Sequence, residues 1–461
     1  MGSRAFGTSS RPDQGTTGVV QSRLSRRRLV ASAGALAGVI LFNRGLALAQ
    51  EATPVATPFP AARDWRAEQW AGTWAAAPHA PSPGFEEFMP SQIFEFANQT
   101  MRQIVRASVG GELVRIRLSN AFGDKPLTIG AAHIALRDED ARIDSASDRA
   151  LTFSGHPSIT IPAGALVLSD PVPLALPPLA ELAVSLYFPE PTTGTTVHGF
   201  SFQTNFISPA GDFTAEIEMP VESTAQTWVI LTGVDVAVAE PASVVVPLGD
   251  SITDGAGSTP DTNQRWPDLL AERLTASTAG QPVAVLNQGI GGNRLLHDGA
   301  GDFAFAGPSA LARFDRDVLS QTGVTHLIVF EGINDIGMPA MAQDDAEAVS
   351  AGEMIAALRQ LAERAHEQGI VAIGATITPF EGAMYFTAEG EEMRQEVNAW
   401  IRDGSAFDAV LDFDVVVRDP NNPTSILPDY DSGDHLHIND AGYRAMAESI
   451  DLSLFALGDA G

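Results

Sequence analysis

Cysteine is absent from the 461-residue sequence. Without it the chain can form no disulfide bond, present no thiolate to a metal ion and use no cysteine nucleophile. A lipoprotein anchor is excluded as well, because the lipid would be attached to a cysteine. The absence of cysteine does not identify the cellular compartment, since many exported bacterial proteins also lack cysteine.

Basic residues are scarce. The chain has 28 lysines and arginines against 57 acidic residues, a formal net charge of −29, and its sole lysine is Lys125. Residues 1–49 hold seven of the arginines and one acidic residue, so the rest carries 21 basic and 56 acidic side chains, or −35. Such a surface repels nucleic acid and anionic membranes, and we expect neither as a partner.

Long apolar runs are also missing. The run at residues 29–42 is shorter than the roughly 20 residues of a membrane span, and it follows a twin arginine at Arg26 and Arg27. Small residues at Ala47 and Ala49 complete the pattern of a signal peptide of the Tat type. We therefore predict a signal peptide over residues 1–49, a secreted protein and no stable membrane insertion after cleavage. An uncleaved N-terminal anchor is the alternative.

The composition of the remainder, 44% hydrophobic and 18% charged over the whole chain, is that of ordinary globular proteins. Residues 50–64 form a linker rich in proline and threonine. Residues 65–240 contain short strand-like runs separated by glycine and proline, for example 127–136 and 183–188. This pattern predicts a β-sandwich or jelly-roll domain.

Residues 241–461 follow a different rhythm, in which strand-like and helix-like segments alternate. The alternation predicts a parallel α/β sheet with helices on both faces, and ligands in such sheets bind beyond the carboxyl ends of the strands. The expected strands are residues 244–248, 283–287, 325–330, 370–377 and 409–413, and the expected helices are 266–274, 309–319, 346–368, 391–401 and 439–455.

Two sequence blocks follow the first two of these strands. The first contains Gly249-Asp250-Ser251, which places a serine at the carboxyl end of the sheet. The second runs from Asn287 to Arg294 and contains three glycines, whose backbone N–H groups could face an anion. A phosphate loop is the alternative for the second block, although it lacks the Walker lysine and the Rossmann glycine spacing.

Two further blocks supply an amide and an acid–base pair. Asn334 follows the third strand, and its side chain can donate into the same crevice, unless it merely forms a local turn. Asp434 precedes His437 by three residues, so the carboxylate can fold back onto the ring and fix its tautomer. A metal site formed by Asp434, His435 and His437 is the alternative. Asp254 and Asp335 are expected to hold loops in place.

The order of the four blocks resembles the SGNH hydrolases, the GDSL lipase/esterase superfamily, over about residues 243–457. This resemblance implies a flavodoxin-like hydrolase domain that needs no cofactor and no metal. It implies that Ser251 is the nucleophile, His437 the base and Asp434 the orienting acid. It also implies an oxyanion hole formed by Ser251, Gly292 and Asn334. Gly291 is the rival of Gly292.

The stretch Arg265-Trp266-Pro267 and the second block resemble a narrower branch of xylan esterases and arylesterases that carry a β-domain ahead of the hydrolase domain. The predicted function is therefore a secreted serine esterase acting on short acyl esters, acetyl above all, of a polysaccharide such as xylan. A lipase or lysophospholipase is one alternative. A carbohydrate-binding protein on a hydrolase scaffold is another. The predicted partner is the ester substrate.

Overall fold

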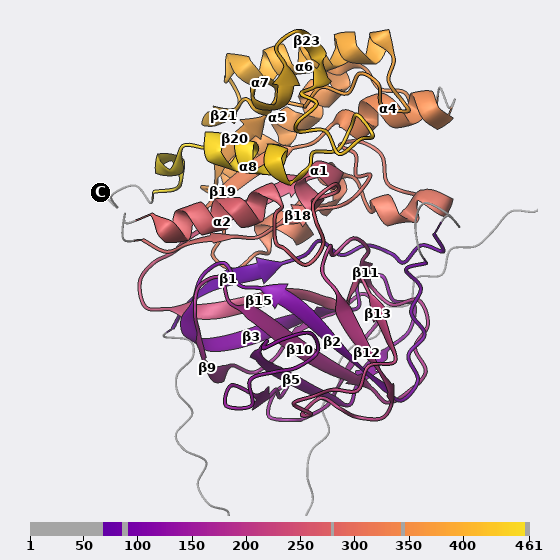
Figure 1. The fold of residues 1–461 in the computed structure, drawn as a ribbon, viewed down its shortest axis with the longest axis vertical. Coiled ribbons are helices and arrows are strands. Elements are labelled where there is room, and N and C mark those ends of the chain that lie inside the picture. Colours follow the sequence, from indigo (N-terminus) through magenta and orange to yellow (C-terminus); the bar gives the residue numbers. More distant parts are fainter. Residues whose placement is uncertain (1–67, 85–90, 278–280, 343–345, 457–461) are drawn as a thin grey trace, which may run out of the picture. The chain divides into compact units, whose positions relative to one another are not determined.

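The computed structural model describes residues 68–84, 91–277, 281–342 and 346–456. The predicted signal peptide and linker lie outside these ranges. Contacts between Cα atoms group Arg63–Gly461 into one compact unit, to which all elements named below belong (Figure 1). Within the described residues, no helix is both long and apolar enough to cross a membrane.

The N-terminal half of this unit is built from antiparallel strands. One sheet has the order β1-β15-β3-β8, with β9 also paired to β3, and a second has the order β13-β12-β2-β10-β5-β6. The first sheet consists of β1 (Gln69–Ala75), β3 (Gly111–Ser119), β8 (Leu166–Leu168), β9 (Val172–Leu176) and β15 (Leu231–Val238). The second consists of β2 (Gln99–Arg106), β5 (Ala131–Leu136), β6 (Arg149–Ala150), β10 (Glu181–Phe188), β12 (Asn205–Ala210) and β13 (Ser223–Ala225).

The two sheets share a hydrophobic core. Met101 and Val105 of β2 belong to the same buried cluster as Ile116 of β3 and Val234 of β15, whereas Ile104 of β2 belongs to a separate cluster. This alternation is the two-residue period of a strand with different environments on its two faces. Two short pairs complete the region, β4 (Leu127–Ile129) with β7 (Ile159–Ile161) and β11 (Val197–His198) with β14 (Trp228–Val229).

The C-terminal half contains a parallel sheet with the order β17-β16-β19-β20-β21. Its strands are β16 (Ser243–Gly249), β17 (Val283–Val285), β19 (His326–Phe330), β20 (Val371–Ala375) and β21 (Ala409–Leu411), and the short β18 (Gln288–Gly289) also pairs with β16. Counted along the chain this is the flavodoxin-like order 2-1-3-4-5, in which ligands bind where the connections diverge, between the first and third strands. Those strands are β16 and β19.

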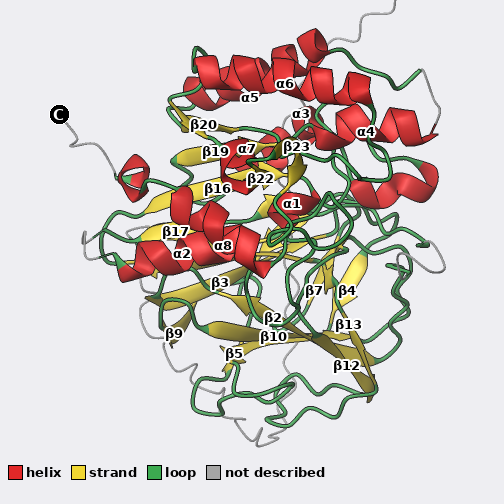
Figure 2. Cartoon of the chain, turned by 45° about the horizontal axis from the view of Figure 1, so that its top comes forward, coloured by secondary structure: helices red, strands yellow, loops and turns green. Residues whose placement is uncertain are grey.

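Helices cover both faces of the parallel sheet, as Figure 2 shows for β16, β19 and β20. Leu327 and Val329 of β19 share a buried cluster with α5, and Ile328 and Phe330 share another with α2 and α8. The α-helices are α1 (Ser251–Asp254), α2 (Trp266–Ala276), α3 (Ala310–Phe314), α4 (Ile333–Ala342), α5 (Ala351–Glu367), α6 (Ala388–Asp403), α7 (Phe413–Val417) and α8 (Asp440–Ser449). Shorter elements are two 3-10 helices (Gly301–Ala306 and Leu452–Phe455), a π-helical turn (Asp315–Leu319) and the hairpin of β22 (Arg418–Asp419) and β23 (Asn422–Ile426).

The first antiparallel sheet contacts the α/β half directly. The Gly72 N–H donates to the Thr322 carbonyl oxygen over 2.9 Å, and the Thr322 hydroxyl donates to Asp235 of β15 over 3.0 Å. A Cβ atom at Gly72 would lie 2.6 Å from a methyl carbon of Leu286. A larger residue at position 72 would therefore require the Leu286 side chain to move.

Several predicted boundaries differ from the structure. The run 127–136 is two strands in different sheets, and Gly130 lies between them. The helix expected over 346–368 begins at Ala351, where Ser350 and Glu353 form a capping box. The helix expected over 439–455 ends at Ser449, and a separate 3-10 turn follows it.

Candidate active site

Ser251 lies at the point where β16 passes into α1. Asp250 caps the helix, and its carboxylate accepts the Ile252 N–H over 2.9 Å. Ser251 is the first residue of α1, so its own N–H has no acceptor within the helix. The serine is 8% exposed. Its backbone N–H and hydroxyl are therefore both held at the carboxyl end of the parallel sheet.

The loop before α8 brings Asp434 and His437 to this serine. His437 Nε2 lies 2.9 Å from Ser251 Oγ, and His437 Nδ1 lies 2.6 Å from Asp434 Oδ2. Asp434 Oδ1 also accepts the backbone N–H groups of Leu436 and His437, over 3.0 and 2.8 Å. Three residues from two ends of the hydrolase half thus form one continuous hydrogen-bonded chain.

The surroundings of Asp434 keep it ionised. Burial by itself would raise its pKa, but the hydrogen bond from His437 and the two backbone donors hold the pKa well below its usual range. An anionic Asp434 accepts the proton of His437 Nδ1, which leaves Nε2 of a neutral ring free to accept the Ser251 hydroxyl proton. The arrangement can therefore generate a serine alkoxide for attack on a carbonyl carbon.

Asn334 is the second residue of α4, at the end of β19. One of its amide hydrogens is donated to the Asn293 carbonyl over 3.0 Å, and its Oδ1 accepts the Tyr385 hydroxyl over 3.3 Å. The second amide hydrogen has no partner among the described residues. The side chain is 3% exposed and lines the same cavity as Ser251. It can donate to an oxygen in that cavity.

Gly291 and Gly292 differ in the use of their N–H groups. The Gly291 N–H donates to Asp254 Oδ2 over 2.9 Å. The Gly292 N–H has no acceptor among the described residues, and this residue has a φ of 77°, which favours glycine. Both line the cavity at Ser251. Gly292 is thus the better candidate for a donor to substrate.

One family model matches the part of the chain that holds these residues. Residues 245–450 match the model described as GDSL-like lipase/acylhydrolase. This part of the chain is a GDSL-type hydrolase. The protein is accordingly a carboxylic ester hydrolase, and the flavodoxin-like fold expected from the resemblance is confirmed.

Solved structures similar to the GDSL hydrolase part include several esterases. A putative lipolytic protein of the G-D-S-L family from Desulfitobacterium hafniense DCB-2 is 22% identical, with 45% of this chain and 96% of that chain covered and a TM-score of 0.33. An acetyl xylan esterase, AlAXEase, has 22% identity, the same coverage and a TM-score of 0.34. An acetylxylan esterase from Geobacillus stearothermophilus has 19% identity, coverage of 45% and 91% and a TM-score of 0.34. A search of curated proteins gives no match.

The cavity at Ser251 of the GDSL hydrolase has a volume of about 270 Å³ and a mostly apolar lining. Ser251, Asn334, Tyr385 and His437 supply polar groups to it. The apolar side chains are Phe200, Phe202, Phe303, Phe305, Met338, Met341, Met384 and Leu436. Phe200 and Phe202 come from the β-rich half, which therefore contributes one part of the wall.

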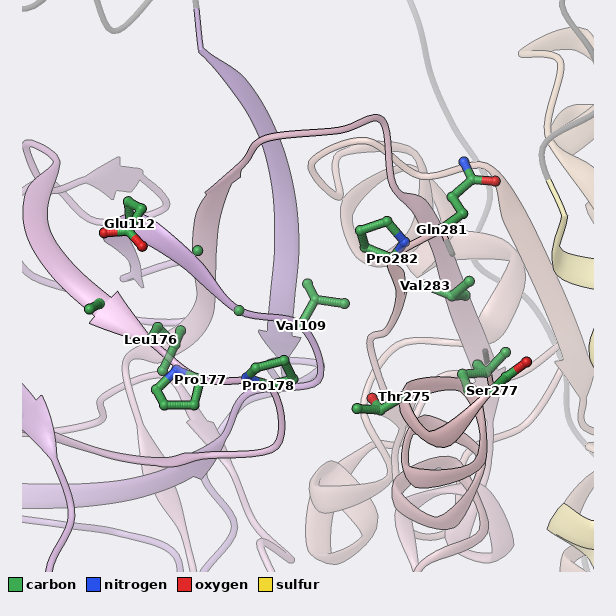
Figure 3. Close-up of a pocket in the computed structure, with 14 residues that line it drawn as sticks. Val109, Glu112, Leu176, Pro177, Pro178, Thr275, Ser277, Gln281, Pro282 and Val283 are labelled. Atoms are coloured by element: carbon green, nitrogen blue, oxygen red, sulfur yellow. The ribbon is translucent and has the colours of Figure 1, made fainter. Parts of the chain in front are cut away.

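A larger cavity, of about 550 Å³, lies between the β-rich half and α2 (Figure 3). Val109, Leu176 and Pro178 line it from one half, and Pro282 and Val283 from the other. Among the described residues that line it, Glu112 is the one ionisable side chain. This cavity thus lacks the acid–base groups of the smaller one.

Buried carboxyl groups lie behind the site. Burial raises the pKa of Asp250 to about 7 and that of Asp335 to about 6, and it raises the pKa of Glu331 well above its ordinary value. Arg313, which is fully buried, contacts Glu331 over 3.4 Å. Asp335 accepts the N–H groups of Leu295 and Leu296, over 2.7 and 3.1 Å. Asp335 therefore ties α4 to the loop that follows the glycines.

His435 does not join the site. Its Nδ1 lies 2.6 Å from Asp431, and it does not share Asp434 with His437. The three ligands of the alternative metal site therefore do not converge. Among the described residues, no group of three or more His, Asp or Glu side chains is arranged to hold a metal ion. Arg294 pairs with Glu347 over 2.6 Å and lines a neighbouring cavity.

Several residues in and around this site carry no motif in the sequence. Tyr385 carries no motif, and its contact with Asn334 depends on Gly337, where a Cβ atom would lie 2.3 Å from the tyrosine ring. Phe200 and Phe202 sit in the β-rich half with no signal that links them to the hydrolase. His198 is a third case, since its partner Asp254 is 56 residues away.

Proposed function

We propose that Ser251, His437 and Asp434 are the catalytic triad of a serine esterase. In this proposal Gly292 and Asn334 complete an oxyanion hole with the Ser251 N–H. The observation that carries it is the chain of contacts from Ser251 Oγ to His437 Nε2 (2.9 Å) and from His437 Nδ1 to Asp434 (2.6 Å), at a cavity that Gly292 and Asn334 also line.

The proposed reaction proceeds in two halves. Ser251 Oγ attacks the ester carbonyl carbon while its proton passes to His437 Nε2, and the three donors stabilise the negative oxygen of the tetrahedral intermediate. Collapse breaks the bond to the leaving alcohol, which takes the proton from His437. Water then repeats the sequence on the acyl-enzyme and releases the acid. The proposal requires no cofactor.

Replacement of the serine tests the triad. Ser251→Ala should lose at least about 99% of kcat, since removal of a triad member is expected to cost far more than that. The melting temperature should change little, because the serine hydroxyl has a single side-chain partner, His437. Turnover of p-nitrophenyl acetate above ~1% of the wild-type rate in purified Ser251→Ala would contradict the assignment.

The proposed substrate is a short acyl ester, acetyl above all, of a polysaccharide such as xylan, and the enzyme is proposed to meet it outside the cell. The predicted export signal supports the location, and the acidic composition favours a neutral glycan over anionic lipid. The cavity volume of about 270 Å³ lies just under the range of roughly 300–1,000 Å³ typical of drug-sized ligands. It therefore suits a small group better than a long lipid chain.

An ester with a larger apolar group, such as an aryl or butyryl ester, is the second candidate. The four phenylalanines and three methionines of the cavity favour it, because each buried methylene contributes about 0.8 kcal/mol. Met384 is 84% exposed at this cavity and Phe303 is 36% exposed, so apolar surface continues to the rim.

A chain-length series separates the two candidates. The quantities to measure are kcat/KM on p-nitrophenyl acetate, butyrate and octanoate, and acetate release from acetylated xylan, with Ser251→Ala as the blank. The first candidate predicts an optimum at acetate together with acetate release from xylan. The second predicts a rise of kcat/KM to butyrate and no release. An optimum at octanoate would instead favour the lipase alternative.

A further inference from the structure

A second histidine–aspartate pair lies beside α1, and the β-rich half supplies its histidine. His198 ends β11, and its Nε2 lies 3.0 Å from Oδ1 of Asp254, the last residue of α1. Their side chains are 5% and 2% exposed, so the contact is closed to solvent. Asp254 follows Ser251 by three residues. The pair therefore fixes the helix that carries the proposed nucleophile.

His198 contacts one acceptor with each of its ring nitrogens. Its Nδ1 lies 2.9 Å from the Ala77 carbonyl oxygen, which can only accept, so Nδ1 is a donor. Its Nε2 faces a carboxylate, so this nitrogen is a donor as well. Burial lowers the pKa of His198, but Asp254 and the Ala77 carbonyl outweigh burial and raise it above the ordinary value. Both ring nitrogens therefore face acceptors.

Other groups around this ring do not replace Asp254. Arg265 disfavours the imidazolium through like charge. The ring of His79 lies 6.1 Å away, and burial lowers its pKa to about 3, so it is neutral. The Trp228 ring lies 5.4 Å from that of His198. Asp254 is thus the acidic side chain that contacts this ring.

Asp254 passes this constraint to the glycine loop. Its Oδ2 accepts the Gly291 N–H over 2.9 Å. The same loop rests directly on α1, since a Cβ atom at Gly289 would lie 2.2 Å from the Asp254 backbone nitrogen. Gly292 is the next residue, and its N–H is the proposed oxyanion donor. A shift of Asp254 would therefore move that donor.

We propose that His198 is a positioning residue for ester hydrolysis. Its Nε2, which lies 3.0 Å from Asp254 Oδ1, holds the Asp254 carboxylate in the orientation that fixes the Gly291 N–H and so aims the Gly292 N–H at the oxyanion. The β-rich half thereby takes part in catalysis through His198, in addition to its wall residues. This inference rests on the proposed function of Gly292 and Ser251.

A merely structural His198 would join the two halves without any effect on the transition state. The two roles separate in kinetics, because a misplaced oxyanion donor lowers kcat with little change in KM. They also separate in inhibition. A boronic acid that forms a tetrahedral adduct with the serine depends on the oxyanion donors. A ground-state product such as the free acid does not depend on them in the same way.

Two substitutions of His198 each keep one of its two side-chain contacts and remove the other. The amide of His198→Asn can replace Nδ1 and still donate to Ala77, but it loses Asp254. The amide of His198→Gln can replace Nε2 and still donate to Asp254, but it loses Ala77. His79→Gln is the matched control, since His79 is a buried histidine of the same region whose contacts are Ala80 and Gly199.

The expected result is a loss of kcat of about 10- to 100-fold in His198→Asn, the size expected when a group is displaced by about 1 Å. KM should stay within about threefold, and boronic acid affinity should fall in parallel with kcat. His198→Gln should lose less than about fivefold, and His79→Gln should keep the wild-type kcat. All rates are compared below the melting temperature of each variant, which is measured first.

Other outcomes overturn the inference. A His198→Asn enzyme with the kcat of His79→Gln would show that Asp254 needs no donor from residue 198. Equal losses in His198→Asn and His198→Gln would show that the Asp254 contact is not the cause. Ser251→Ala is measured in parallel. If this variant is inactive, the proposed function stands and only the role of His198 has failed. If it is active, the proposed function itself has failed.

Discussion

Two histidine–aspartate pairs flank Ser251, and they differ in what the second ring nitrogen contacts. His437 has a side chain 21% exposed, with Asp434 on one nitrogen and the Ser251 hydroxyl on the other. His198 is 5% exposed, with Asp254 on one nitrogen and the Ala77 carbonyl on the other. A ring that faces a reacting hydroxyl can take and return a proton, whereas a ring between two fixed acceptors keeps its proton.

The comparison teaches that a carboxylate beside a histidine does not identify a catalytic base. His435 makes the same point, because it also pairs with an aspartate, Asp431, yet contacts no nucleophile. The deciding contact is the one made by the nitrogen that does not face the carboxylate. That contact follows from the fold and not from the local sequence.

The largest loss of activity is expected when the pair of His437 and Asp434 is broken. His437→Gln should lower kcat by roughly 10⁴-fold or more, because the serine then lacks a base. His435→Gln is the control and should stay within about fivefold of wild type, since His435 contacts Asp431 and not Ser251. Initial rates on p-nitrophenyl acetate measure both. A greater loss in His435→Gln than in His437→Gln would reverse the assignment of the two residues.

A smaller loss of activity is expected when a donor of the proposed oxyanion hole is removed. Asn334→Ala should lower kcat by roughly 10²–10³-fold with a smaller change in KM, because the amide acts mainly on the transition state. This loss should exceed that of His198→Asn, which displaces a donor without removing one. Steady-state kinetics on one ester give both parameters. A change confined to KM would instead place Asn334 in ground-state binding.

The smallest effect concerns stability and pH, and the two pairs should respond in opposite directions. The pKa of His198 is raised, so its contribution is complete below its unfolded value of about 6.5 and is lost as pH rises through the folded value. The pKa of Asp434 is lowered, so its contribution is present above about 3.9 and is lost as pH falls.

Melting temperatures of wild type, His198→Gln and Asp434→Asn between about pH 3 and 9 test the direction in which each contribution to stability changes with pH. The difference in melting temperature between wild type and His198→Gln should become smaller toward alkaline pH. The difference between wild type and Asp434→Asn should become smaller toward acid pH. A melting-temperature difference between wild type and His198→Gln that shrinks toward acid pH and is constant above about pH 7 would show that the ring is neutral in the folded protein.

The parallel sheet was predictable from the sequence because its strands are buried on both faces and read as continuous apolar runs. Five of the expected helices are present with shifted ends. Helix α4 was missed, because Gly337 and Pro339 interrupt the pattern that marks a helix. In the β-rich half, strands as short as β11 and β14 carry too few residues for a period to show.

The candidate site was predictable where its residues fall into short blocks at strand ends. Asp434 and His437 are three residues apart, and the contact between them is local. Tyr385, Phe200 and His198 were not predictable, because their contacts join distant parts of the chain with no motif at either end. Asp254 was expected to hold a loop, but nothing in the sequence indicated that a histidine of the other half would hold Asp254.

The close approach of β1 to the parallel sheet at Gly72 has a consequence for how the protein melts. Leu286 is fully buried, and part of its cover is the backbone of the β-rich half. If that half unfolded alone, apolar surface of the hydrolase would become exposed to water, and Thr322 would lose its hydrogen bonds with Gly72, Asp235 and Arg117 at once. The two halves should therefore unfold cooperatively, in one calorimetric peak, and a hydrolase half expressed by itself should aggregate.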